Sequence, residues 1–280
     1  MANISISDDD FEKFKEFFYR KTGIQFEHNK RYFVDKRLCD RIIASHSDSF
    51  RSYFTLLRFQ ASGLELQALV NAMTINETYF FREEYQFDCL VNSILPEIVA
   101  AKNNREPIRI WVIPSSSGEE AYTIAMCLLE RWSGIDQWDV EIISSDIDTH
   151  ILNQARAGLY TARSVKNVPA QYLKRHFKNT PEGYQISDDL RSAVEFTRVN
   201  LMEPADVRNY RNFDVIFCRN LLIYFDDLSR KQAAETFYDA LQPQGFICLG
   251  HSESMSRISS LYKIRKFSDA IVYQKPGDRI

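Results

Sequence analysis

Acidic residues directly follow two short apolar runs near the middle of the chain. Glu119 and Glu120 come after the run IRIWVI and the turn PSSSG, and Asp146 ends the run VEIISSD. Each run precedes an apolar pattern with helical spacing, so we expect two buried strands that are each followed by a helix. In a sheet built from such units, ligands bind beyond the carboxyl ends of the strands. The three acids are therefore candidate ligand-binding residues.

Two classes of ligand bind at the turn after the first strand of such a sheet. A dinucleotide needs a G-x-G-x-x-G turn, because its pyrophosphate approaches bare backbone. Here Gly118 is the only glycine of the turn, and Glu119 and Glu120 would repel phosphate. S-adenosylmethionine has no phosphate and carries a sulfonium and an ammonium against one carboxylate, so nearby acids suit it.

Asp146 would then hold the ribose hydroxyls of the cofactor, as an acid after the second strand does in dinucleotide folds. Taken singly, Glu119 can instead complement the dipole of the helix that it begins, and Asp146 can cap the helix that follows it. Their placement after consecutive strands favours the cofactor for both.

The totals of the 280-residue chain exclude several other kinds of protein. A formal net charge of −3 provides no general surface for nucleic acid. No apolar run approaches the length of a membrane span, and the acidic start MANISISDDDFEKF lacks the layout of a secretion signal, so we expect a cytoplasmic location. The cysteines and histidines are scattered without metal-ligand spacing, so we expect no metal site.

The order of the elements predicts two domains. The first part of the chain has helical patterns only, so we expect a helical N-terminal domain over residues 1–90. From residue 108 strands and helices alternate, which is typical of a doubly wound α/β sheet and predicts a second domain over residues 91–280. The stretch at about 162–198 breaks the alternation and predicts a small inserted subdomain of antiparallel strands. The segments LYKIRKF and AIVYQK predict a closing antiparallel hairpin.

Two helices of the N-terminal part have distinct faces. The pattern DDDFEKFKEFFYRKT places four aromatic residues close to one face and ends at a glycine: Phe11, Phe14, Phe17, Phe18 and Gly23. The next helix, over NKRYFVDKRLCDRIIAS, is expected to bury Phe33, Leu38, Ile42 and Ile43. Its surface carries five basic residues: Lys30, Arg31, Lys36, Arg37 and Arg41. This basic helix is a candidate docking face, although an ordinary solvated helix has the same pattern.

Five stretches of sequence, taken in order, resemble the motif series of the chemotaxis receptor methyltransferases, the CheR family. They are NETYFFRE (76–83), SSSGEEAYTIAM (115–126), SSDIDTHILNQARAGLY (144–160), FDVIFCRNLLIYFD (213–226) and GHSESM (250–255). The resemblance covers nearly the whole chain. It implies a doubly wound, Rossmann-like methyltransferase domain that depends on S-adenosylmethionine, with an all-helical N-terminal domain and a small inserted antiparallel β-subdomain.

The resemblance also implies an activity and a set of site residues. Members of the family transfer a methyl group from S-adenosylmethionine to glutamate side chains on receptor cytoplasmic helices, giving methyl esters and S-adenosylhomocysteine. Matched motif by motif, the residues implied to contact the cofactor are Asn76, Thr78, Arg82, Glu119, Asp146, Asn200, Leu201, Arg219 and Asn220. Arg82 and Tyr224 are implied to be the catalytic residues near the transferred methyl group.

A glutamate acceptor needs little from the enzyme beyond placement. Its carboxylate is ionised at neutral pH and can attack the methyl group without a general base, so proximity, alignment and a dry pocket remain to be supplied. Arg82 or Arg219 can orient the acceptor carboxylate, although Arg82 can also form a surface ion pair with Glu83 or Glu84. Tyr224 can also be a core aromatic, because its neighbours are apolar.

The partners implied by the family are the cytoplasmic domains of transmembrane chemoreceptors. We expect a monomer that binds no nucleic acid and does not insert into the membrane. Some members bind a receptor tail peptide through the inserted subdomain, where they carry a longer, glycine-rich loop. The corresponding stretch FKNTPEGYQIS is short, so we expect no dependence on this tether.

Two functions from other classes remain open. One is a regulatory module that binds S-adenosylmethionine without turnover, which cofactor binding without methyl transfer would support. The other is a nicotinamide-dependent oxidoreductase, which the missing glycines and Glu119 disfavour.

Overall fold

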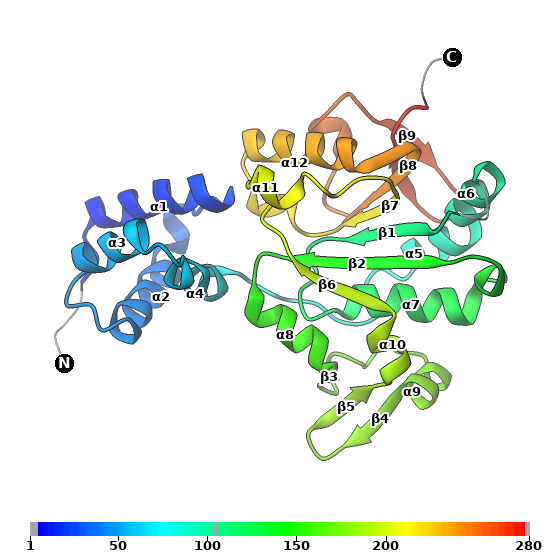
Figure 1. The fold of residues 1–280 in the computed structure, drawn as a ribbon, viewed down its shortest axis with the longest axis horizontal. Coiled ribbons are helices and arrows are strands. Elements are labelled where there is room, and N and C mark those ends of the chain that lie inside the picture. The colour runs from blue at the N-terminus through cyan, green and yellow to red at the C-terminus, as the bar shows by residue number, and fades with distance from the viewer. Residues whose placement is uncertain (1–4, 103–105, 278–280) are drawn as a thin grey trace.

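The computed structural model of the protein describes residues 5–102 and 106–277, in which a helical domain lies beside a large sheet (Figure 1). The helices of the N-terminal part are α1 (Asp8–Thr22), α2 (Arg31–Ala44), α3 (Phe50–Phe59) and α4 (Leu64–Met73), with a short 3-10 turn at His28–Lys30. Their inward faces share one apolar cluster that is separate from the core of the sheet. The N-terminal part therefore has a hydrophobic core of its own.

Helix α1 confirms the predicted aromatic face and its predicted end. Three of the aromatic residues are fully buried and Phe17 is half-buried. Gly23 ends the helix in the left-handed region, with a φ of 71°, and its N–H donates to the carbonyl of Tyr19 at 2.7 Å. A Cβ at Gly23 would lie 2.8 Å from the side chain of Met202. Only glycine meets both conditions, so this residue fixes how α1 meets the sheet domain.

Helix α2 departs from the prediction at Ile43. Leu38 and Ile42 are buried as expected, Phe33 is half-buried, and Val34 completes the inward face. Ile43, which we predicted to point inward, is 55% exposed. Successive residues of a helix point about 100° apart, so a helix that buries Ile42 turns its neighbour outward.

Seven strands form the central sheet in the order β6-β2-β1-β7-β8-β10-β9. Their bounds are β1 Ile108–Val112, β2 Val140–Asp146, β6 Val194–Arg198, β7 Phe213–Cys218, β8 Leu241–Leu249, β9 Lys263–Lys266 and β10 Ile271–Gln274. The first five strands of this order are parallel, and β10 is antiparallel to both β8 and β9. The predicted doubly wound sheet and its closing hairpin are confirmed.

Helices cover both faces of the sheet, as the alternation along β1 requires. Ile108, Ile110 and Val112 pack with α7 (Glu119–Arg131) and with the helical segment 85–101. Trp111 packs on the opposite face with α12 (Asp227–Ala240). The remaining helical elements are α5 Tyr85–Cys89, a π turn Leu90–Ile94, α6 Leu95–Ala101, α8 Thr149–Ala157, α11 Pro204–Val207 and 3-10 turns at Ile135–Gln137, Leu222–Tyr224 and Met255–Arg257. A strand buried on both faces is the usual support for a ligand site at its carboxyl end.

The inserted subdomain is a second, three-stranded antiparallel sheet in the order β3-β5-β4. It contains β3 (Leu159–Tyr160), α9 (Ala170–His176), β4 (Phe177–Thr180), β5 (Gly183–Ile186) and α10 (Asp188–Ser192). The predicted range of about 162–198 for the insert stays a prediction, and strand pairing bears on both of its ends. The small sheet begins earlier, at β3, and β6 pairs in parallel with β2 in the main sheet. Strand pairing decides this, and the local sequence pattern does not report it.

The segment between α4 and α5 joins the two parts of the molecule. Helix α4 ends at Met73, whereas Phe80 and Phe87 already belong to the core of the sheet. The predicted division at residues 90 and 91 stays a proposal, and the packing favours a boundary before Phe80.

Candidate active site

A cavity of about 270 Å³ lies at the carboxyl ends of β1, β2 and β7, where the N-terminal part meets the sheet. Strand order reverses between β1 and β7, so this is the switch point at which doubly wound sheets bind ligands. Seven of the predicted site residues line it: Asn76, Thr78, Arg82, Asp146, Arg219, Asn220 and Tyr224. Segments far apart in the sequence thus meet around one space.

A smaller cavity of about 40 Å³ adjoins the first one and shares Asp146 with it. Asn200 and Leu201, two further predicted site residues, line this smaller cavity. Asn200 is also a structural link, because its Nδ2 donates to the carbonyl of Lys21 in α1 at 2.7 Å.

The turn after β1 is tied directly to the end of β2. The Ser116 N–H donates to Oδ2 of Asp146 at 2.8 Å, and Oδ1 of Asp146 accepts from the Asp148 N–H at 3.0 Å. Asp146 is 4% exposed, and burial raises its pKa to about 6. The hydroxyl oxygens of Ser115 and Ser116 are buried and have no partner within the described residues, although both residues line the cavity. Unpartnered polar groups of this kind indicate a polar ligand.

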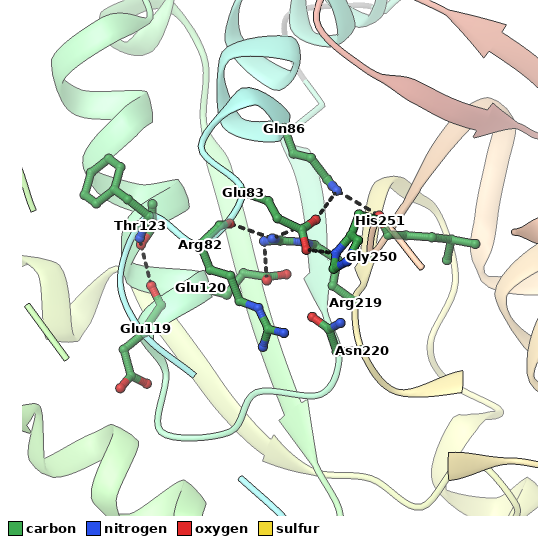
Figure 2. A network of polar contacts seen from close by, with 12 residues as sticks. Arg82, Glu83, Gln86, Glu119, Glu120, Thr123, Arg219, Asn220, Gly250 and His251 are labelled. Carbon is green, nitrogen blue, oxygen red and sulfur yellow. Dashed lines mark hydrogen bonds and ion pairs between the residues drawn. The ribbon is translucent and has the colours of Figure 1, made fainter. Parts of the chain in front are cut away.

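Glu119 lies outside the lining of both cavities. Its Oε1 accepts from the Ser164 hydroxyl at 2.6 Å and its Oε2 from the Ser117 hydroxyl at 2.7 Å, and burial raises its pKa. Figure 2 shows its side chain pointing away from Arg219, whereas Glu120 points toward it. Adjacent residues at a helix start face different directions, so only one glutamate of the pair can face the cavity. The sequence predicted Glu119 as the cofactor contact, whereas the glutamate of the pair that lines the cavity is Glu120.

Arg219 is at the centre of a buried ion network (Figure 2). Its side chain is 1% exposed; Nη1 donates to Glu120 at 2.6 Å, and Nη2 donates to the Arg82 carbonyl at 2.5 Å and lies 3.3 Å from Glu83. Burial raises the pKa of Glu120, although Arg219 opposes this shift. Burial also acts to raise the pKa of Glu83, but His251 and Arg219 outweigh it, so the pKa of Glu83 is lowered. Arg219 is therefore engaged by its neighbours. It is not free to orient a substrate carboxylate, which the sequence had offered as a role for Arg82 or Arg219.

Arg82, in contrast, is held only loosely. Its Nη1 donates to the Glu77 carbonyl at 3.1 Å and its guanidinium lies 5.8 Å from the centre of the Tyr79 ring. The alternative of an ion pair with Glu83 or Glu84 is not formed: Glu83 contacts Arg219, and Glu84 contacts Arg131. Arg82 is therefore the cation of the cavity that can change partner when a substrate arrives.

The backbone of the segment 76–82 is anchored, so the side chains of Asn76 and Arg82 are presented on a fixed support. Nδ2 of Asn76 donates to Asp148 at 2.9 Å. The N–H of Phe80 donates to the carbonyl of Ser164 at 3.1 Å, and that of Phe81 donates to the Thr123 hydroxyl at 3.2 Å. These bonds tie the segment to three different elements.

Glu253, in the GHSES stretch, holds the loop that follows β7. Its carboxylate accepts from the backbone N–H groups of Asn220 at 2.8 Å, Leu222 at 2.8 Å and Gly250 at 2.9 Å. Asn220 has a φ of 58°, in the left-handed region, which asparagine enters more readily than most other L-residues. The sequence did not predict this role. Nothing in the residues around Glu253 indicates that its carboxylate accepts three backbone hydrogen bonds.

The N-terminal part supplies one wall of the cavity through Ile24, Phe26 and Met73. Ile24 forms a β-bridge with Phe225, and the Gln25 N–H donates to the carbonyl of Tyr224 at 3.2 Å. Tyr224 is thereby placed at the junction, where it is half-buried, lines the cavity and also packs against the apolar core. No sequence signal marks this wall, because its residues are ordinary apolar side chains after a helix.

Among residues 5–102 and 106–277, no group of histidine, cysteine, aspartate or glutamate side chains could hold a metal ion. In the same part of the chain, no helix has the length and apolar character needed to cross a membrane.

The fold and the site define the chain as a methyltransferase that depends on S-adenosylmethionine. Residues 76–271 match the family described as "CheR methyltransferase, SAM binding domain", and residues 9–74 match "CheR methyltransferase, all-alpha domain". The chain belongs to the CheR methyltransferase family.

Curated relatives match along almost the whole chain. "Chemotaxis protein methyltransferase 2" of Vibrio cholerae is 55% identical over 277 residues, covering 99% of this chain and 96% of the relative. "Chemotaxis protein methyltransferase 2" of Pseudomonas aeruginosa is 36% identical, covering 91% and 90%. "Chemotaxis protein methyltransferase" of Borreliella burgdorferi is 34% identical, covering 90% of each chain. The resemblance stated from the motifs is confirmed.

Proposed function

We propose that this protein transfers the methyl group of S-adenosylmethionine to glutamate side chains on the cytoplasmic helices of chemoreceptors. The products are glutamate methyl esters, which serve sensory adaptation, and S-adenosylhomocysteine. The observation that carries the proposal is the contrast between two arginines at the cavity. Arg219 already pairs with Glu120 and Glu83, and only its buried Nε has no partner among the described residues, whereas Arg82 has one weak internal bond and can receive a carboxylate from a substrate.

The residues of the cavity fit S-adenosylmethionine. Asp146 offers a buried carboxylate to the ribose hydroxyls, and it lies between the main cavity and the smaller one beside Leu201. We assign the adenine to the smaller, apolar space and the methionine end to the main one. Glu120 faces the main cavity and suits the positive charge at that end, while Ser115 and Ser116 offer unpartnered hydroxyls.

When bound, S-adenosylmethionine supplies an electrophilic methyl group on its sulfonium. The protein has to place an ionised carboxylate in line with it and to keep water out. Arg82 would hold one oxygen of that carboxylate, and Tyr224, which also lines the cavity, would shape its approach. No proton needs to move, because a glutamate is already ionised at neutral pH.

We further propose that the enzyme works without a receptor tail peptide, in the cytoplasm and as a monomer. Only Pro181 and Glu182 lie between β4 and β5, so the turn of the small sheet is tight. A tight turn leaves little loop to close over an added strand. Measurable affinity for a peptide matching a chemoreceptor C-terminus would contradict this part.

The test is methyl transfer itself. The protein is incubated with S-adenosylmethionine carrying a labelled methyl group and with membranes that contain chemoreceptors, and the product is treated with mild base. We expect label on the receptor that base releases as methanol, which identifies a carboxyl ester. Base-stable label would contradict the glutamate acceptor, and tight cofactor binding without any label would favour the regulatory module.

A further inference from the structure

A groove of about 580 Å³ runs between α1 and α3, on the N-terminal part and separate from the cavity already described. Its lining on α1 is Lys13, Glu16, Phe17, Arg20 and Lys21, and on α3 it is Phe54 and Arg58. The residues of α1 recur at intervals of three and four, so they share one helix face along about two turns.

The groove is strongly basic, although the whole chain has a formal net charge of −3. Its single acid, Glu16, is already paired with Arg20. The side chains of Lys13 and Lys21 have no ion pair or hydrogen bond in the part of the chain that the structure describes. Two exposed cations at opposite ends of the α1 face are therefore available to acidic groups of a partner.

The floor of the groove is aromatic. Phe17 and Phe54 are half-buried and meet edge to face, with ring centres 5.3 Å apart. Arg58 lies over Phe54 and over Phe59, and Phe59 is 73% exposed. A groove between two helices with an apolar floor and basic rims suits an amphipathic helix with an apolar stripe and acidic flanks.

The basic helix α2, which the sequence predicted as a docking face, is largely occupied by internal contacts. Arg31 pairs with Asp8 and Asp35. Arg37 donates to the Ala72 carbonyl at 2.6 Å and stacks over Phe33, and Arg41 contacts Glu65 at 2.6 Å. These three cations stabilise the helical domain, so the charge that a partner can use lies mostly in the groove between α1 and α3.

We propose that this groove holds an acidic, amphipathic helix of the methyl-accepting receptor; the inference rests on the proposed function. The groove and the cavity have no lining residue in common, but the end of α1 connects the two. The carbonyl of Lys21 accepts from Asn200, and Ile24, just beyond the end of α1, lines the cavity. In Figure 1, α1 runs toward the sheet, so a helix seated along it would extend toward that part of the molecule.

The experiment uses paired charge reversals in the full chain. The groove variant is K13E with K21E, and the matched control is K231E with K266E, two exposed lysines on α12 and β9. A third variant, K30E with K36E, tests α2. Binding of a labelled receptor cytoplasmic fragment is measured by anisotropy, apart from turnover, and KM for the receptor and Kd for S-adenosylmethionine are measured beside it.

We expect the groove variant to raise the receptor Kd and KM about fivefold, and salt to weaken wild-type binding more than that of the variant. The kcat of the groove variant at saturating receptor and its affinity for S-adenosylmethionine should equal those of the wild type. The matched control and the α2 variant should equal the wild type in all of these quantities, including the Kd and KM for the receptor. Unchanged receptor binding in the groove variant, or an equal loss in either other pair, would overturn the proposal. Groove-dependent binding without formation of a glutamate ester would leave the docking site standing and reject the proposed function instead.

Discussion

The cavity has two walls of different construction. The wall at the strand ends contains Asp146 and Arg219, which are almost completely buried and bonded to backbone or to other charges. The opposite wall, from Ile24 to Arg82, is made of loops at the junction of the two parts and keeps Arg82 partly exposed. A preformed polar wall suits a small cofactor of fixed shape, whereas an open wall suits a protein substrate that must enter and leave.

Replacing Arg219 by methionine should break the strand-end wall most severely. Glu120 and Glu83 would be left as buried carboxylates facing each other, and removing one partner of such a network costs about 3–5 kcal/mol. We expect a large fall in melting temperature and in binding of S-adenosylmethionine. Arg82→Met is the matched control, and an equal loss of stability there would show that the two walls do not differ as described.

Replacing Arg82 by alanine should affect activity without affecting stability. The loss of a charged hydrogen bond to the acceptor carboxylate is expected to lower kcat/KM for the receptor about 100-fold, roughly 2–3 kcal/mol. Melting temperature should stay near that of the wild type, because Arg82 has one weak internal bond. Arg82→Lys should recover part of the rate, and an unchanged rate in Arg82→Ala would remove this residue from the reaction.

Replacing Asp146 by asparagine should weaken S-adenosylmethionine binding about tenfold, roughly 1.4 kcal/mol, because an amide accepts ribose hydroxyls less strongly. In the folded protein the pKa of Asp146 is about 6, above its usual value of 3.8. Because this pKa is raised on folding, ionised Asp146 destabilises the folded protein. The free energy of unfolding should therefore rise as pH falls from about 6 to about 4 and Asp146 becomes protonated in the folded state.

The same protonation removes an acceptor from the cofactor site. Affinity for S-adenosylmethionine should therefore fall as pH is lowered through 6 in the wild type and stay level in Asp146→Asn. Titration calorimetry across this range is the measurement. Parallel pH profiles for the two proteins would reject Asp146 as the ribose ligand.

Replacing Glu253 by glutamine should have the smallest effect of the four. One oxygen acceptor of the carboxylate becomes an amide donor, so one or more of its three backbone bonds is lost, at a cost of about 1 kcal/mol. We expect faster amide hydrogen exchange at Asn220 and Leu222 and a modest rise in the Kd of S-adenosylmethionine. Exchange confined to other segments would show that Glu253 does not hold this loop.

Much of the architecture could be predicted because its signals are local. The faces of α1, the strands β1 and β2 and the closing hairpin each follow from the spacing of apolar residues in one stretch of sequence. The sequence left the range of the insert approximate, because β3 and β6 are assigned to a sheet by their pairing partners. The local pattern of Val194–Arg198 is that of a strand, and it says nothing about which sheet the strand joins.

By itself, the sequence determined the family, the strand ends that meet at the cavity and the acids nearest to it. The reason is that the order of the motifs and the direction of the strands can be read directly from the linear sequence. Only the tertiary structure decided which glutamate of the pair faces the cavity and which of the two arginines is already engaged. Glu120 lines the cavity and Glu119 does not, and Arg219 pairs with carboxylates while Arg82 has one weak internal bond. The physical reason is that the direction of a side chain and the pairing of its charge depend on the distant segments that pack against it. Two residues of the same type differ in these contacts, which the local sequence does not report.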